Sequence, residues 1–271
     1  MTYDDRIGDP VHAVGPQGPW DDVRSLVAGR GIAVVCATWP QWLPAVQDDP
    51  ALRSLLGRDW DRFVRTPEPT VRSRFAASRM IVKYAAGAAL GTTPESLELA
   101  YRPGGRPYLR GFDQLEISLT HTEEVIAVGL NRRGRIGVDV EPLGRTLHRD
   151  VEHLVCTPDE RTALAGLPTD VRERELRRLW TLKEAYTKAL GQGMRLGFTQ
   201  FGFGPDGRGG LRTPQGSRGE RGEWAFATFT VFGRWLLSVA GHDAGLDPDP
   251  DIHVDSMLDE RFMAAVADWS P

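Results

Sequence analysis

The feature that most constrains the fold is a helical segment, residues 172–191, that is apolar along one side and charged along the other. Successive residues of an α-helix turn by about 100°, so residues three and four apart share a face. The apolar arc holds Leu179, Leu182, Tyr186, Ala189 and Leu190, and the opposite arc holds Trp180, Lys183, Glu184, Thr187 and Lys188. The apolar arc predicts a helix that packs on a core. The charged arc is either a solvated face with a Glu–Lys pair four residues apart or a surface that meets a ligand.

A second acidic feature favours the ligand. Asp139 and Glu141 lie two residues apart in an apolar, strand-like run, so both carboxylates project from the same face. Adjacent carboxylates repel one another unless a cation lies between them. A plain solvent-facing strand is the alternative, but Gly137 and the valines around the pair argue against it. With Glu184 as a third oxygen ligand, the set suits Mg²⁺ and a bound phosphate.

The order of predicted elements indicates an α+β fold with an internal duplication. Each half is predicted to run through a long helix, a strand, a Gly-rich turn and two further strands; the helices cover 71–90 and 172–191. Strands are predicted at 31–37, 97–101, 117–120, 125–130, 136–141, 224–232 and 235–240, and a short helix at 160–164. We expect a pseudo-twofold pair of similar α+β lobes with the active site in the cleft between them.

Domain boundaries follow from the same pattern. Residues 1–30 are Gly/Pro-rich and are predicted to be a partly ordered leader. Residues 31–134 are the predicted N-terminal lobe, and 135–242 the C-terminal lobe that carries the metal site. Residues 243–271 are an acidic tail with a predicted short helix at 258–266.

Composition excludes several classes of protein. The net charge of −4 gives no overall attraction to nucleic acid, and no apolar run is long enough to span a membrane. The N-terminus lacks the pattern of a secretory signal. The two cysteines, Cys36 and Cys156, form no disulfide framework and fit free thiols in a reducing cytoplasm.

Several cations accompany the acidic residues. His121 lies in a hydroxyl-rich run just past a strand, although a lone histidine is more often structural. Arg106 lies in a Gly-Gly-Arg-Pro turn, where it is either an ordinary turn arginine or a mobile cation on a rigid mount. Arginines between residues 62 and 79 form either a solvated face or a phosphate-binding surface. Together with the metal site, these cations indicate phosphoryl transfer on a substrate with a diphosphate and a further phosphate.

Four motifs in order resemble one known family. Residues 137–141 (GVDVE) and 180–188 (WTLKEAYTK) are similar to the two signature motifs of the surfactin-type 4′-phosphopantetheinyl transferases. Residues 105–109 (GRPYL) and 118–121 (SLTH) resemble its two upstream motifs, with Arg and Thr where Lys and Ser are common. The resemblance covers about residues 31–242, and the ordered spacing makes it far more specific than any single motif.

The resemblance implies a reaction and its machinery. The phosphopantetheine arm of coenzyme A would pass to a serine of an acyl or peptidyl carrier protein, releasing adenosine 3′,5′-bisphosphate. Asp139, Glu141 and Glu184 would bind Mg²⁺, with Glu160 as a further acid near the metal. Glu184 would act as the base, directly or through a water, and Lys188 would offset charge on a phosphate.

The resemblance also implies how coenzyme A is held. Arg106 would lie by the 3′-phosphate and adenine. The positions that the resemblance assigns to coenzyme A are Arg74, Lys83, Arg106, Thr120, His121, Lys183 and Lys188. Because the cleft of a duplicated enzyme lies within one chain, we expect a monomer.

Two other classes of function stay open from the sequence alone. A metal-dependent nuclease or phosphohydrolase also uses carboxylates and lysine, but it predicts affinity for nucleic acid, which the charge does not favour. A non-catalytic module that binds a carrier protein or coenzyme A predicts the loss of an acidic ligand, yet all three acids are present.

Overall fold

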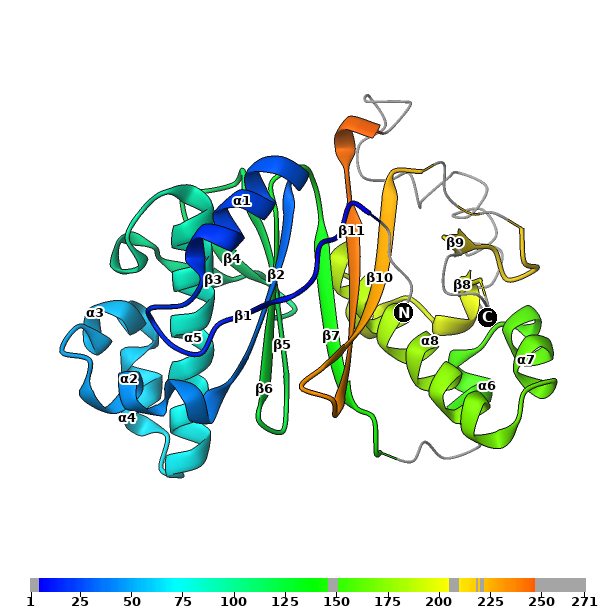
Figure 1. The fold of residues 1–271 in the computed structure, drawn as a ribbon, viewed down its shortest axis with the longest axis horizontal. Coiled ribbons are helices and arrows are strands. Elements are labelled where there is room, and N and C mark those ends of the chain that lie inside the picture. The colour runs from blue at the N-terminus through cyan, green and yellow to red at the C-terminus, as the bar shows by residue number, and fades with distance from the viewer. Residues whose placement is uncertain (1–4, 146–150, 205–209, 218, 220–221, 247–271) are drawn as a thin grey trace.

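Two sheets pack against each other at the centre of the computed structural model, which describes residues 5–145, 151–204, 210–217, 219 and 222–246 (Figure 1). The first sheet has the strand order β1-β2-β6-β5, and the second has the order β10-β11-β7. Helix α5 covers the outer side of the first sheet and helix α8 the outer side of the second (Figure 1). The result is a mixed α+β architecture of four layers.

The elements have the following bounds. The strands are β1 (Val11–His12), β2 (Ile32–Thr38), β3 (Leu99–Tyr101), β4 (Pro107–Leu109), β5 (Glu116–Thr122), β6 (Val125–Asn131), β7 (Ile136–Pro142), β8 (Gly202–Phe203), β9 (Leu211–Arg212), β10 (Trp224–Val231) and β11 (Trp235–His242). The α-helices are α1 (Trp20–Arg30), α2 (Leu43–Asp48), α3 (Leu52–Leu56), α4 (Trp60–Arg65), α5 (Pro69–Leu90), α6 (Val151–Val155), α7 (Pro158–Ala165) and α8 (Thr169–Leu190).

Strand β2 shows why the two sheets stack. Its sequence is apolar on both faces, as expected for a strand that is covered on both sides. Ala33, Val35 and Ala37 belong to the core beneath α5. Ile32, Val34 and Cys36 point the other way, into the core between the two sheets. The side chains of strand β6 likewise alternate between the core beneath α5 and the core between the two sheets. The two sheets therefore share one continuous apolar interface.

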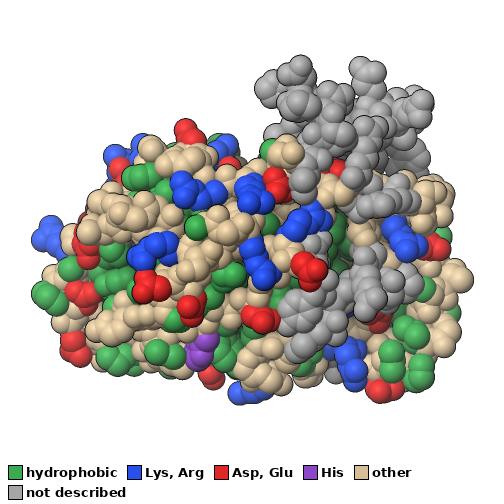
Figure 2. Space-filling model, turned by 45° about the horizontal axis from the view of Figure 1, so that its top comes forward, with side chains coloured by type: hydrophobic (Ala, Val, Ile, Leu, Met, Phe, Trp, Pro, Cys, Tyr) green, Lys and Arg blue, Asp and Glu red, His purple; other side chains and the backbone are tan. Residues whose placement is uncertain are grey.

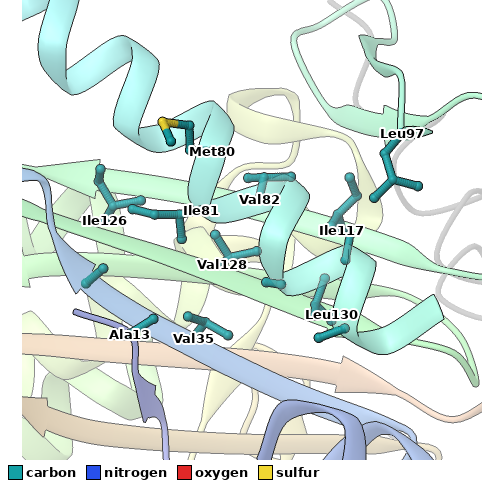
Figure 3. Close-up of a cluster of buried hydrophobic side chains, with 14 of the residues drawn as sticks. Ala13, Val35, Met80, Ile81, Val82, Leu97, Ile117, Ile126, Val128 and Leu130 are labelled. Carbon is teal, nitrogen blue, oxygen red and sulfur yellow. The ribbon is translucent and has the colours of Figure 1, made fainter. Parts of the chain in front are cut away.

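Helix α5 is set by its ends and by its apolar side. Glu68 caps its N-terminus by accepting hydrogen bonds from the backbone N–H groups of Thr70 and Val71, and Pro69 occupies the first turn. Gly91 ends the helix in the left-handed conformation, with φ of 69°. Figure 3 shows side chains of the helix interleaved with those of the first sheet, among them Met80, Ile81, Val82, Ile126, Val128 and Leu130.

Helix α8 lies unusually close to β7. A Cβ atom placed on Gly137 would come within 1.8 Å of the carbonyl oxygen of Ala185, a contact that real Cβ atoms do not make. Next to this point the Thr181 hydroxyl is hydrogen-bonded to Ser238 of β11 at 2.6 Å. Glycine and small polar side chains therefore let the helix backbone rest directly on the sheet.

The two halves of the chain follow the same order of elements. After β2 come α5, the β3–β4 hairpin and the β5–β6 hairpin, and β6 pairs antiparallel with β2. After β7 come α8, the β8–β9 hairpin and the β10–β11 hairpin, and β11 pairs antiparallel with β7. Both long helices have 22 residues and end at a left-handed glycine, Gly91 or Gly191.

The N-terminal segment is more regular than its composition suggested. Residues 20–30 form α1, and Val11 and His12 pair in parallel with β2. Ile7 is 1% exposed and lies in the core between the sheets. Helix α1 was not predicted because the Gly/Pro-rich composition of residues 1–30 outweighed a short apolar period at Trp20, Val23 and Val27, all of which contact the core beneath α5.

The predicted strands and long helices are confirmed within a few residues. The expected tail helix at 258–266 and part of the predicted Gly-rich loop at 205–222 lie outside the described residues, and the described part of that loop contains the short strand β9. No helix in the described part of the chain is both long enough and apolar enough to cross a bilayer.

Candidate functional site

The charged residues of α8 and β7 meet where β5 runs beside β7. Because Val138 and Val140 point into the core between the sheets, Asp139 projects from the other face, toward α8. The Lys188 ammonium donates to Asp139 Oδ1 at 2.6 Å. Glu184 precedes Lys188 by four residues, about one helical turn, so both lie on the side of α8 that faces β7.

Strand β5 contributes a hydroxyl to the same point. The Thr120 hydroxyl donates to Asp139 Oδ1 at 3.3 Å, and Lys188 Nζ donates to Thr120 Oγ1 at 3.2 Å. Two residues before Thr120 on β5, Ser118 Oγ accepts a hydrogen bond from the backbone N–H of Val138 at 3.1 Å. The site is thus built from both sheets and from α8, by segments far apart in the sequence.

The carboxylate of Asp139 is only half satisfied. Its Oδ1 atom accepts the two hydrogen bonds described above, whereas Oδ2 is buried and has no hydrogen-bond partner among the described residues. A buried carboxylate oxygen without a partner is costly, because it has lost its water and gained no donor. An additional cation at this oxygen would remove that cost.

Asp139, Glu141 and Glu184, which we call the acidic cluster, repel one another. Burial raises the pKa of Glu141, and the charge of Asp139 raises it further. Burial, the charge of Asp139 and, more weakly, that of Glu141 raise the pKa of Glu184. Lys188 opposes both shifts, and Arg145 pairs with Glu141 at 3.3 Å.

The cluster has a stability consequence that can be measured. We expect Glu184→Gln to raise the thermal midpoint of the metal-free protein at pH 7.5 by roughly 1–3 °C. The pKa of Glu184 in the folded protein is raised above its ordinary value of 4.5, which we take for the unfolded chain. The free energy of unfolding therefore falls as the pH rises from the unfolded-state pKa to the folded-state pKa. Differential scanning fluorimetry in EDTA measures this difference, which should vanish at about pH 4. A gain of equal size at both pH values would contradict the account.

The donor set fits a hard divalent cation. The three acidic side chains offer carboxylate oxygens, the ligands that Mg²⁺ prefers, and one of those oxygens is buried and unpartnered. In the described part of the chain, no three His, Cys, Asp or Glu side chains are already gathered closely enough to hold a metal ion. In this structure the Asp139 carboxylate is paired with the Lys188 ammonium.

His121 and Arg74 lie at the edge of the site. His121 follows Thr120 on β5 and is exposed. Partial desolvation lowers the pKa of His121, and the charges of Arg74, Arg79 and Lys188 lower it further. The positive charges of Arg74, Arg79 and Lys188 therefore act on the His121 imidazole, and a role of His121 and Arg74 in holding coenzyme A stays a prediction.

Arg106 is not the mobile cation that its turn suggested. Its guanidinium donates to Glu116 Oε2 at 2.6 Å and to the Ala189 carbonyl oxygen at 2.6 Å. The second bond caps the C-terminal end of α8, where carbonyl groups lack partners within the helix. Arg106 thus ties the β3–β4 turn to α8, next to Gly191.

Lys83 lies apart from the acidic cluster. It is 3% exposed, and burial lowers its pKa. The charges that oppose this shift are those of Asp59, Glu95 and Glu98. These acids belong to the first half of the chain, and none of them is a member of the acidic cluster.

Lys183 requires a correction. Its prediction as a ligand-facing residue is wrong, because the side chain is 0% exposed and points away from β7. The ammonium donates to Glu160 Oε2 at 2.6 Å and to three backbone carbonyl oxygens, those of Val155, Phe198 and Phe201, at 2.7–2.8 Å. All of its protons are engaged, so Lys183 binds α8 to the segments around α6 and α7.

Glu160 has a structural role as well. It completes a capping box with Thr157 at the start of α7. One carboxylate oxygen accepts from Lys183, and the other accepts from the backbone N–H of Phe203 at 2.8 Å. Both oxygens are therefore occupied, and the structure does not place Glu160 in the acidic cluster.

Sequence reasoning missed two arginines near Glu141. Arg177 is 6% exposed and donates to the carbonyl oxygen of Arg145, which in turn pairs with Glu141. The signal was available for Arg177: it precedes Glu184 by seven residues, which is two helical turns, so both lie on the same face of α8. No such periodicity marked Arg145, which follows β7.

Comparisons with known proteins agree with the resemblance seen in the sequence. Residues 135–240 match the family model of the 4′-phosphopantetheinyl transferase superfamily. This segment includes the acidic cluster and Lys188. The matched segment begins at β7 and ends within β11, so it covers the second sheet and α8.

Individual relatives give the same result. The 4′-phosphopantetheinyl transferase HetI of Nostoc sp. is 33% identical over 132 residues, covering 46% of this chain and 55% of that protein. A putative 4′-phosphopantetheinyl transferase of Synechocystis sp. is 28% identical over 155 residues, covering 56% and 63%. A 4′-phosphopantetheinyl transferase of Bacillus subtilis is 24% identical over 139 residues, covering 51% and 61%. The chain thus matches between about half and two thirds of the length of these relatives.

Proposed function

We propose that this protein transfers the 4′-phosphopantetheine arm of coenzyme A to a serine of an acyl or peptidyl carrier protein. The observation that carries the proposal is the acidic cluster with Lys188, which lies within the segment that matches the transferase family. The relatives named above support the same reaction class by their names.

We also propose that the chain is an internal duplication, with lobes at 31–134 and 135–242 and coenzyme A bound between them. The matching order of elements and the matching pairing of β6 with β2 and of β11 with β7 support it. So does the meeting of β5 with β7, which joins Thr120 of one half to Asp139 of the other. A monomer would then hold a complete site.

Asp139, Glu141 and Glu184 would hold Mg²⁺. When bound, the ion would neutralise the coenzyme A diphosphate and polarise the phosphate that is attacked. The free Oδ2 atom of Asp139 and the mutual repulsion of the three carboxylates support this assignment.

The protein side chains have separate tasks in the reaction. The serine oxygen of the carrier attacks the phosphorus that bears the pantetheine arm. The bond from that phosphorus to the bridging oxygen breaks, and adenosine 3′,5′-bisphosphate leaves with the electron pair. Glu184, directly or through a water, takes the serine proton. Lys188 would donate to the phosphate oxygens that gain charge.

The remaining polar and basic side chains would hold coenzyme A. Thr120 and His121 offer donors on β5 beside the acidic cluster, and Arg74 lies near His121. Arg106 could reach a phosphate only by leaving Glu116 and the carbonyl oxygen of Ala189. We place Lys83 and Lys183 outside this set, for the structural reasons given above.

The described residues on the face drawn in Figure 2 lack the pattern expected of a nucleic-acid-binding surface. On the face drawn in Figure 2, basic and acidic side chains are interspersed. A nucleic acid partner would call for a continuous basic surface. We further propose that the protein acts in a reducing cytoplasm, with both buried cysteines as free thiols.

Product analysis tests the proposed function. The protein is incubated with coenzyme A and Mg²⁺, with and without an apo carrier protein, and nucleotide products are separated by chromatography. We expect adenosine 3′,5′-bisphosphate only when the carrier is present and in amounts equal to the modified carrier. Release without a carrier would indicate a phosphohydrolase, and binding of coenzyme A with no product from several carriers would indicate a binding module.

A further inference from the structure

We propose that Lys188 is an exchangeable counterion of Asp139. In the metal-free protein its ammonium pairs with the Asp139 carboxylate, and when a divalent cation binds there the ammonium moves to the coenzyme A diphosphate. This inference rests on the proposed function. It gives Lys188 a role before the reaction begins, in addition to its contact with phosphate during the reaction.

The contacts of Lys188 show how it is held. The Nζ atom lies 2.6 Å from Asp139 Oδ1 and 3.2 Å from Thr120 Oγ1. The ammonium therefore bridges α8, β7 and β5 at the point where a cation would bind the acidic cluster. Its positive charge reduces the repulsion among the carboxylates.

Exposure shows which partner can move. The Lys188 side chain is 31% exposed, whereas that of Asp139 is 9% exposed. Lys188 can swing toward solvent or toward a phosphate on its flexible stem, while Asp139 is fixed in β7. Lys183, five residues earlier on α8, has no such freedom, because it is fully buried against Glu160 and three carbonyl groups.

Charge makes the two cations competitors. An ammonium and a divalent ion at the same carboxylate repel each other strongly in a partly buried site. A divalent ion at the free Oδ2 atom of Asp139 would therefore repel the ammonium on Oδ1 of the same carboxylate and weaken its contact with Asp139. A diphosphate beside the site would accept the displaced ammonium, so metal and coenzyme A should each favour binding of the other, by linkage.

Direct metal binding without coenzyme A tests the exchange. Mn²⁺ is titrated into the full-length protein, and free Mn²⁺ is followed by electron paramagnetic resonance; Mg²⁺ competition measures its affinity. We expect Lys188→Met to bind Mn²⁺ at least about tenfold more tightly than the unsubstituted protein, because a competing positive charge is gone. Lys188→Arg, which keeps the charge, should remain near the unsubstituted value.

A second readout covers the possibility that the variant is poorly folded. In EDTA, Lys188→Met should unfold at a lower temperature than the unsubstituted protein, because the acidic cluster has lost its counterion. Mn²⁺ should then raise the midpoint of Lys188→Met more than that of the unsubstituted protein. Arg174→Met is the matched control, since it removes an exposed positive charge from the same helix, and it should change neither quantity.

The outcomes separate this inference from the proposed function. Equal or weaker Mn²⁺ binding by Lys188→Met, with binding still lost in Asp139→Asn, would overturn the exchange and leave the metal site in place. Binding that is insensitive to Asp139→Asn in every background would overturn both the exchange and the proposed metal site.

Discussion

Gly137→Ala is expected to lower the free energy of unfolding by at least about 3 kcal/mol, and to give little folded protein if the loss exceeds the total stability. The added methyl would lie 1.8 Å from the Ala185 carbonyl oxygen and 2.6 Å from the Ala189 backbone nitrogen. Neither is the end of a flexible side chain, so α8 as a whole would have to move away from β7. Urea unfolding followed by circular dichroism measures the loss.

The substitution should also damage the site wherever the protein still folds. Helix α8 carries Glu184 and Lys188, so its displacement would separate Lys188 from Asp139. Gly144→Ala is the matched control, because no heavy atom lies within 4 Å of the position of its added methyl. Unfolding of Gly137→Ala within about 1 kcal/mol of this control would contradict the close packing of α8 on β7.

Lys183→Met is expected to cost about 3–5 kcal/mol of stability, because it leaves the Glu160 carboxylate buried without its countercharge. It also removes the donor from the three carbonyl groups that Lys183 binds. The same denaturation experiment measures the change. In the alternative role that the sequence suggested, as a phosphate ligand, Lys183→Met would weaken binding of coenzyme A and leave stability unchanged.

A double variant isolates the buried pair. Adding Glu160→Gln to Lys183→Met removes the unpaired charge and should restore part of the lost stability, although the carbonyl groups stay without a donor. Arg174→Met again provides a control for loss of a positive charge from α8. A Lys183→Met variant that unfolds within about 1 kcal/mol of the unsubstituted protein would show that the buried pair is not structural.

The sequence predicted the elements that carry the site because their patterns are strong. The alternation in β7 separates Val138 and Val140 from Asp139, and the structure has the same division. The long helices were found within a few residues because apolar periodicity and terminal glycines both mark them. Helix α1 was missed because it is short and lies in a Gly/Pro-rich segment, although Trp20, Val23 and Val27 recur at helical spacing.

The error at Lys183 shows what helical periodicity lacks. An arc of charged residues was assigned to one surface, but α8 is covered on more than one side. Lys183 faces α6 and α7, whereas Glu184 and Lys188 face β7. Its partner Glu160 lies 23 residues away in the sequence, and the resemblance assigned that acid to the metal. Only the packing of α7 against α8 decides between the two roles.

The error at Arg106 has a similar origin. Its turn predicted a rigid mount, which the structure has, but not the partners of the guanidinium. Glu116 and the Ala189 carbonyl group come from different elements, and the second belongs to the other half of the chain. A contact between halves depends on how the two sheets stack, and no local pattern in the sequence encodes it.

The most direct test of the central claim is the intact mass of an apo carrier protein after incubation with this protein, coenzyme A and Mg²⁺. We expect a gain of one phosphopantetheine group, about 340 Da by its formula, with Glu184→Gln slowing the gain at least about a hundredfold and EDTA abolishing it. A gain that persists unchanged in Glu184→Gln and in EDTA would contradict the claim that the acidic cluster performs a metal-assisted transfer.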